Sequence, residues 1–144
     1  VFVGDGDLNL KQSLQKKIEK LKLDGVVHWL PALSEVSPVY EALDLLVCPS
    51  RGEGFPNVLA EGMAHGKIVI ASDVGDNKLI VENRDFIFQP EDPFALAKTL
   101  EHVLNLSESE RDFWRTQGIV KIKENYSVQK YIERTESYFF RALA

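Results

Sequence analysis

In Arg51-Gly-Glu-Gly-Phe-Pro-Asn-Val-Leu-Ala-Glu-Gly-Met-Ala-His-Gly66, two carboxylates lie on either side of a turn that opens a predicted helix. The preceding residues, 44–49, are typical of a buried strand, and two glycines of the stretch permit a sharp turn. Asn57 is the expected N-terminal cap of the helix. The sequence therefore places Glu53 in the loop and Glu61 inside the helix.

This arrangement suits a negatively charged ligand that carries hydroxyl groups. A helix that begins near Asn57 directs the backbone N–H groups of Val58 and Leu59 across the loop, where they would stabilise a phosphate. Pro56 has no N–H group but fits the first turn of a helix. Glu61 lies one turn further, so its carboxylate can accept two hydrogen bonds from a ribose diol. The pairing of these features indicates a nucleotide.

A purely structural interpretation of the two acids stays open. Glu53 is then a solvated loop residue, and Glu61 is a first-turn acid that the helix dipole favours. The spacing of the two residues does not separate this interpretation from nucleotide binding.

Short apolar runs alternate with helical patterns along most of the chain. Strands are predicted near residues 1–3, 26–30, 45–48, 67–71 and 86–88, and helices near 8–22, 34–43, 57–65, 77–82 and 93–105. This alternation predicts an α/β fold with a Rossmann-like parallel sheet flanked by helices.

The chain after residue 105 has a helical pattern throughout. Ser107 and Glu110 have the spacing of a capping box, and Ser127 heads a last helix that we expect to reach Leu143. Four aromatic residues of that helix form an apolar stripe that is typical of core or interdomain packing: Tyr131, Tyr138, Phe139 and Phe140.

Every segment suspected of ligand contact follows a predicted strand. These segments are residues 4–6, 30–32, 50–57 and 72–76. Because ligands of open α/β sheets lie beyond the carboxyl ends of the strands, we expect the segments to line one cleft. The short turn Gly4-Asp5-Gly6 is also compatible with an ordinary connection between a strand and a helix.

The segments 49–66 and 68–75 resemble the donor-binding half of retaining GT-B glycosyltransferases of family 4, also called glycosyl transferases group 1. The similarity extends back through residues 1–6 and forward through residues 88–97, at the spacings of that family. It implies the C-terminal half of a GT-B fold. The whole chain, 1–144, would be a single nucleotide-sugar-binding domain that ends in helices over 107–144.

The resemblance also implies roles for individual residues. In the family, the first glutamate of the E-x7-E motif lies against the donor sugar and diphosphate, and the second holds the ribose hydroxyls. These positions are Glu53, which would orient the sugar as the catalytic residue, and Glu61. Arg51 and Lys78 are candidate cations near the diphosphate, and the loop at Leu30 would touch the base edge through its backbone. The implied donor-binding residues are Gly4, Gly6, Leu30, Arg51, Gly54, Phe55, Asn57, Val58, Leu59 and Glu61.

The implied reaction transfers a sugar from a nucleotide-diphosphate sugar to a glycan or glycolipid acceptor, with retention of anomeric configuration, in polysaccharide, lipopolysaccharide or glycolipid synthesis. The family's acceptor domain, its basic residues and the first strand of this domain would precede Val1. We therefore expect this piece alone to be inactive, with open strand edges at residues 1–3 and 45–48. Two alternatives are a non-catalytic nucleotide-binding or scaffold module and a sugar-nucleotide epimerase with the GT-B fold, although residues 53–55 match the transferases better.

Composition sets outer limits on function. A length of 144 residues with 44% hydrophobic content suits one soluble globular domain. The net charge of −5, without a basic run, argues against nucleic-acid binding. The single cysteine, Cys48, fits a reducing cytosol. The three histidines have no metal-binding spacing, so we expect neither a metal nor a cofactor. With no apolar run long enough to cross a bilayer, we expect a cytoplasmic protein, free or peripheral at the inner membrane surface.

Overall fold

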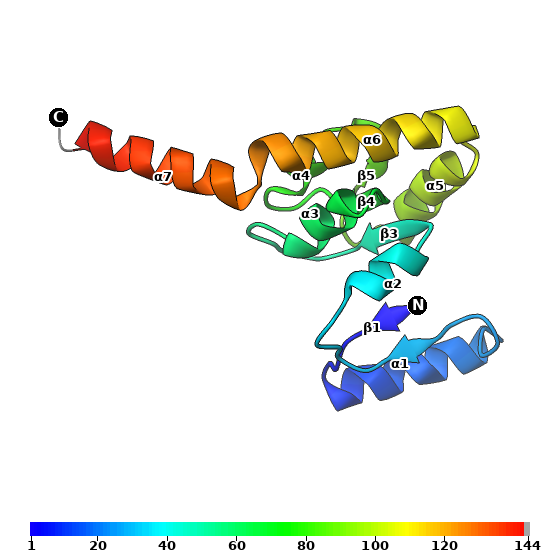
Figure 1. Ribbon diagram of the computed structural model, residues 1–144. Helices are drawn as coiled ribbons and strands as arrows, with labels where there is room; N and C mark the ends of the chain where they lie inside the picture. The colour runs from blue at the N-terminus through cyan, green and yellow to red at the C-terminus, as the bar shows by residue number, and fades with distance from the viewer. Residues whose placement is uncertain (143–144) are drawn as a thin grey trace. The chain divides into compact units, whose positions relative to one another are not determined.

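Short parallel strands form two sheets in the computed structural model, which describes residues 1–142 (Figure 1). The first sheet pairs β1 (Phe2–Val3) with β2 (Trp29–Leu30) and belongs to a compact unit, Val1–Pro38. The second sheet belongs to the unit that begins at Val39. Its strand order is β3 (Leu45–Cys48), β4 (Ile68–Ser72) and β5 (Ile87–Phe88). The predicted α/β class with parallel strands is confirmed.

The first unit is one strand–helix–strand crossover. Helix α1 (Leu8–Lys20) begins where the side chain of Asp7 accepts a hydrogen bond from the N–H of Leu10, at 2.8 Å. The rings of Phe2 and Trp29, which are paired in register, stack with their centroids 4.9 Å apart. Strand β2 is shorter than the predicted 26–30, because the N–H groups of residues 26 and 27 bond to the carbonyl of Leu23 and close a turn instead.

Strand β4 is the centre of the second unit. All five of its residues are buried, and it lies between β3 and β5, as a nearly continuous apolar run predicts. The helices and the 3-10 turn of this unit are α2 (Ser37–Ala42), α3 (Asn57–Ala64), α4 (Asn77–Val81), η1 (Arg84–Phe86), α5 (Pro93–Leu104), α6 (Glu108–Asn125) and α7 (Val128–Ala142). The first two residues of α2, Ser37 and Pro38, belong to the first unit.

Helix α6 covers the core of the second unit. It packs against α3 and β4 (Figure 1). Gly118 there allows contact with the side chain of Met63. The edge of the Trp114 ring contacts Phe86, with centroids 5.4 Å apart. A single apolar cluster therefore joins the sheet to the helices that hold its connecting loops in place.

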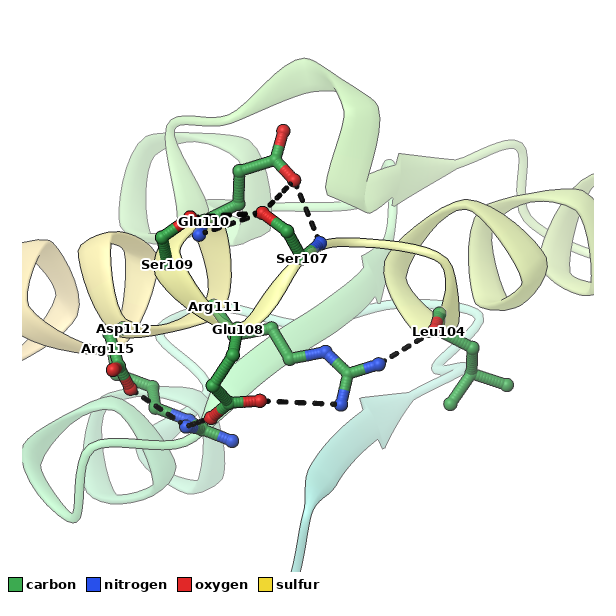
Figure 2. Close-up of polar contacts among 8 residues, drawn as sticks. All are labelled: Leu104, Ser107, Glu108, Ser109, Glu110, Arg111, Asp112 and Arg115. Atoms are coloured by element: carbon green, nitrogen blue, oxygen red, sulfur yellow. Dashed lines mark hydrogen bonds and ion pairs between the residues drawn. The ribbon is translucent and has the colours of Figure 1, made fainter.

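Polar contacts at the start of α6 confirm the predicted capping box (Figure 2). The hydroxyl of Ser107 accepts a hydrogen bond from the N–H of Glu110 at 3.3 Å, and the N–H of Ser107 donates to Glu110 Oε2 at 2.8 Å. The hydroxyl of Ser107 also lies 2.6 Å from that carboxylate oxygen. The hydrogen bonds from the Ser107 hydroxyl and N–H lower the pKa of the Glu110 carboxyl below its ordinary value.

Replacing Ser107 with alanine is expected to lower the free energy of unfolding by about 1 kcal/mol, because one N–H group of the first turn loses its acceptor. Because the pKa of Glu110 is lowered on folding, its contribution is present at neutral pH and is lost as the pH falls through that lowered pKa. Denaturant unfolding at neutral and acidic pH measures both effects. Ser137→Ala, inside α7, is the control that should not destabilise the protein. Equal stability of Ser107→Ala and the unaltered protein at neutral pH would disprove the cap.

Helix α7 presents its apolar residues to solvent. The hydroxyl of Ser127 accepts a hydrogen bond from the N–H of Lys130 at 3.4 Å, so Ser127 heads the helix as predicted. Leu143, its predicted end, lies outside the described residues. The aromatic stripe is not part of a core, because its four residues are exposed. Within residues 1–142, no helix has the length and apolarity needed to cross a membrane.

Candidate functional site

The loop after β3 holds the first acid of the site. The carboxylate of Glu53 accepts a hydrogen bond from the hydroxyl of Ser50 at 2.6 Å. The hydroxyl of Ser72, at the end of β4, donates to the carbonyl of Ser50, also at 2.6 Å. A chain of two short hydrogen bonds therefore anchors the Glu53 loop to the buried central strand and limits the positions of its carboxylate.

A second contact between the loops after β3 and β4 depends on a glycine. Gly75 has φ +48°, and a Cβ atom on it would lie 2.8 Å from the carbonyl carbon of Glu53 and 3.1 Å from the carbonyl oxygen of Gly54. The N–H of Asp76 donates to the carbonyl of Gly54 at 3.3 Å. The predicted meeting of segments 50–57 and 72–76 at the carboxyl ends of the strands is thus confirmed.

The start of α3 differs from the prediction in two ways. Pro56 occupies the cap position without a side-chain hydrogen bond, and Asn57 is the first helical residue, so the expected cap by Asn57 is wrong. The N–H of Leu59 is not free for a phosphate, because it donates to the carbonyl of Pro56 at 3.1 Å. The extended proline takes the cap position, and the first turn closes tightly behind it. Val58 is exposed on this turn.

The second acid, Glu61, is exposed on α3, where it accepts a hydrogen bond from a buried tyrosine. The hydroxyl of Tyr40 donates to Glu61 Oε2 at 2.7 Å. The Tyr40 ring stacks on His65, with centroids 5.0 Å apart, and His65 Nδ1 lies 2.9 Å from the carbonyl oxygen of Glu61. Burial of Tyr40 and its bond to the carboxylate of Glu61 raise the pKa of the tyrosine well above its ordinary value, so the hydroxyl stays protonated. Sequence reasoning missed Tyr40, because no spacing links it to an acid 21 residues later.

Three neighbouring side chains are paired or packed. Arg51 Nε lies 2.9 Å from the carboxylate of Glu91, and both side chains are exposed. Lys78, the other candidate cation, pairs with Asp73 at 3.1 Å. The ring of Phe55 lies against that of Tyr126, the residue that follows α6, with centroids 5.2 Å apart. The two exposed ion pairs, of Arg51 and of Lys78, contribute little to stability, so each cation can exchange its carboxylate partner for a ligand anion.

The remaining predicted residues belong to the unit Val1–Pro38. Gly4 has φ +125° and accepts a hydrogen bond on its carbonyl from Trp29 Nε1 at 3.3 Å. The carboxylate of Asp5 accepts a hydrogen bond from the N–H of Ala32 at 3.1 Å, which ties the turn after β1 to the turn after β2. A Cβ atom on Gly4 or Gly6 would have no neighbour within 4 Å. A single cleft that joins Gly4, Gly6 and Leu30 to Glu53 and Glu61 stays a prediction.

A cavity of about 410 Å³ lies elsewhere in the second unit. It opens beside α6 at the start of β4, and its lining includes Ile68, Phe86, Trp114 and Lys121. Lys121 Nζ is paired there with Glu82 at 2.9 Å. None of the predicted site residues lines this cavity. Both acids lie in the segment that follows the carboxyl end of β3, and ligands of such sheets bind at the carboxyl ends of strands.

The second unit thus carries two carboxylates, each of which accepts a hydrogen bond from a hydroxyl group. Glu53 bonds to Ser50, and Glu61 bonds to Tyr40. A carboxylate has about four acceptor positions, so each acid retains acceptor capacity for the hydroxyl groups of a ligand. The first turn of α3 lies between them in the sequence and favours negative charge at its N-terminus. The arrangement can bind a molecule that combines hydroxyl groups with an anion.

Comparison with known proteins finds glycosyltransferases and a polysaccharide biosynthesis protein. The family model for glycosyl transferases group 1 matches residues 1–106. A curated relative described as an uncharacterized glycosyltransferase of Haemophilus influenzae is 26% identical over 135 residues, which are 92% of this chain and 37% of the relative. The Vi polysaccharide biosynthesis protein VipC/TviE of Salmonella typhi is 26% identical over an alignment 148 residues long, which covers 100% of this chain and 25% of the relative.

The fold matches solved glycosyltransferase structures of the GT-B type. HepE of Anabaena, whose structure was solved in complex with UDP, superposes with a TM-score of 0.82 at 22% identity. The match covers 94% of this chain and 39% of HepE. The chain therefore spans well under half of the length of each of these three proteins.

Proposed function

Because the chain belongs to the glycosyl transferases group 1 family, we propose that it binds a nucleotide-diphosphate sugar and forms the donor side of a sugar transfer to an acceptor. The observation that carries the proposal is the pair of hydroxyl-bonded carboxylates, Glu53 in the loop after β3 and Glu61 on α3. Their acceptor positions suit the two polyhydroxylated ends of such a donor, the sugar and the ribose.

The diphosphate lies between these ends in our proposal. Pro56 caps α3 between the two acids in the sequence, and the exposed first turn at Val58 offers a positive dipole end to the leaving nucleoside diphosphate. Arg51 can exchange its exposed partner, Glu91, for a phosphate oxygen. Glu53 orients the sugar, and transfer proceeds with retention of anomeric configuration.

The choice of donor and acceptor draws on the relatives. The structure of HepE contains UDP, which makes UDP-sugars the first donors to test, followed by GDP- and ADP-sugars. The name of VipC/TviE places that relative in polysaccharide synthesis, which supports a glycan or glycolipid acceptor for this chain. The acceptor side would come from polypeptide outside residues 1–144. We therefore propose that residues 1–144 alone are not an active transferase.

Replacing Glu61 with alanine is expected to weaken binding of the nucleoside diphosphate by about 1.5 kcal/mol, or roughly tenfold, because the ribose loses a charged acceptor. Calorimetry on the full natural polypeptide with UDP, GDP and ADP measures the change. Glu101→Ala, an exposed acid on α5, is the matched control and should bind as tightly as the unaltered protein. Unchanged affinity in Glu61→Ala would refute the ribose role, and binding without any transfer of sugar would favour a non-catalytic module.

A further inference from the structure

Tyr40 links the helix before β3 to the acid on α3. Its side chain is buried at 6% exposure, whereas Glu61 is exposed. The hydrogen bond from the Tyr40 hydroxyl to Glu61 Oε2, at 2.7 Å, therefore joins a buried anchor to a solvent-facing carboxylate.

The environment of Tyr40 leaves its hydroxyl little freedom. The ring is stacked on His65, and His65 Nδ1 lies 2.9 Å from the backbone carbonyl of Glu61. Tyr40 and His65 therefore contact both the backbone and the side chain of the same residue. An exposed glutamate samples several rotamers, and fixing one of them when a ligand binds costs entropy. The contact with Tyr40 restricts these rotamers before a ligand binds.

The bond also determines which acceptor positions of Glu61 are left. Tyr40 uses one position on Oε2, so the rest of that oxygen and the whole of Oε1 can accept hydrogen bonds from a ligand. Two neighbouring hydroxyl groups on one ring can donate to the two oxygens of one carboxylate only when the carboxylate plane is correctly turned. The hydrogen bond from Tyr40 favours one orientation of that plane.

We propose that Tyr40 is a positioning residue that sets the orientation of the Glu61 carboxylate for the two hydroxyl groups of the donor ribose. This inference rests on the proposed function, in which Glu61 binds the ribose. Preorganisation of this kind raises affinity by removing the cost of ordering the side chain, without a new contact to the ligand.

The test compares Tyr40→Phe with the unaltered full polypeptide, using whichever of UDP, GDP or ADP binds most tightly and its 2′,3′-dideoxy analogue. Phenylalanine keeps the ring that stacks on His65 and removes only the hydroxyl. We expect the ribonucleotide to bind about fivefold more weakly, a typical effect of one net hydrogen bond, and the dideoxy analogue to bind unchanged. Tyr131→Phe, at an exposed tyrosine of α7, should change neither affinity.

A double-mutant cycle separates positioning from a general structural effect. When Glu61 is already alanine, adding Tyr40→Phe should cause no further loss of affinity, because the hydroxyl then has no carboxylate to orient. Additive losses would overturn the proposal. So would an equal loss for the ribonucleotide and its dideoxy analogue.

The remaining outcomes distinguish this inference from the proposed function. If Glu61→Ala weakens binding and Tyr40→Phe does not, the ribose role stands and the positioning role is wrong. If Glu61→Ala has no effect, or none of the three nucleotides binds, the proposed function fails and the inference fails with it. Loss of folding in Tyr40→Phe would also contradict the proposal, because Glu61 is exposed and water can replace the hydroxyl.

Discussion

Glu53→Gln is expected to slow sugar transfer by about a hundredfold while the affinity for the bare nucleoside diphosphate stays within about twofold. Glutamine keeps the size of the side chain and an oxygen that can accept from Ser50, as the carboxylate does at 2.6 Å. It removes the negative charge that, in the proposed function, orients the sugar hydroxyls and stabilises positive charge as the leaving group departs. Release of the nucleoside diphosphate from the donor sugar measures transfer, and calorimetry measures binding.

The proposed division of labour between the two acids makes this experiment selective. Glu61→Ala provides the comparison, since its loss should lie mainly in nucleotide binding. Equal losses of transfer and of nucleotide binding in Glu53→Gln would contradict the assignment of Glu53 to the sugar end. Full transfer activity in Glu53→Gln would exclude any part for its charge.

Gly75→Ala is expected to lower the free energy of unfolding by about 2–4 kcal/mol, among the larger effects of a single substitution. The backbone there has φ +48°, which disfavours alanine, and the added Cβ atom would overlap the backbone carbonyl of Glu53. Relief of that overlap moves the Glu53 loop, so donor binding should weaken as well. Denaturant unfolding and calorimetry on one protein preparation measure the two losses.

Gly52→Ala is the matched control for this substitution. It lies in the loop after β3, which Gly75 approaches from the loop after β4, but a Cβ atom there would have no neighbour within 4 Å. We expect its stability to change by less than about 0.5 kcal/mol. If Gly75→Ala proves as stable as Gly52→Ala, the loops after β3 and β4 do not approach each other as described.

Local signals predicted most of the fold. Strand β3 has its predicted bounds, 45–48, because an apolar run between turns admits few other structures. The capping box at Ser107 and Glu110 was predictable because both residues lie within one helical turn. In the site, the same signals placed Glu53 in a loop and Glu61 in a helix.

Contacts between segments distant in the sequence were not predictable. The bond from Tyr40 to Glu61 depends on the packing of α2 and α3, which no periodicity encodes. The ion pair of Arg51 with Glu91 joins residues 40 positions apart, and the backbone of Glu91 has φ +59°. The prediction of Asn57 as the cap of α3 was a local error. Pro56, in an extended conformation, occupies the cap position instead.

A crystal structure of the full natural polypeptide with its best-binding nucleoside diphosphate, chosen from UDP, GDP and ADP, tests the central claim most directly. We predict density for the ribose within hydrogen-bond distance of the Glu61 carboxylate and for the diphosphate at the first turn of α3, beside the Glu53 loop. Density in the cavity beside α6, or a bound nucleotide that touches neither Glu53 nor Glu61, would contradict the account.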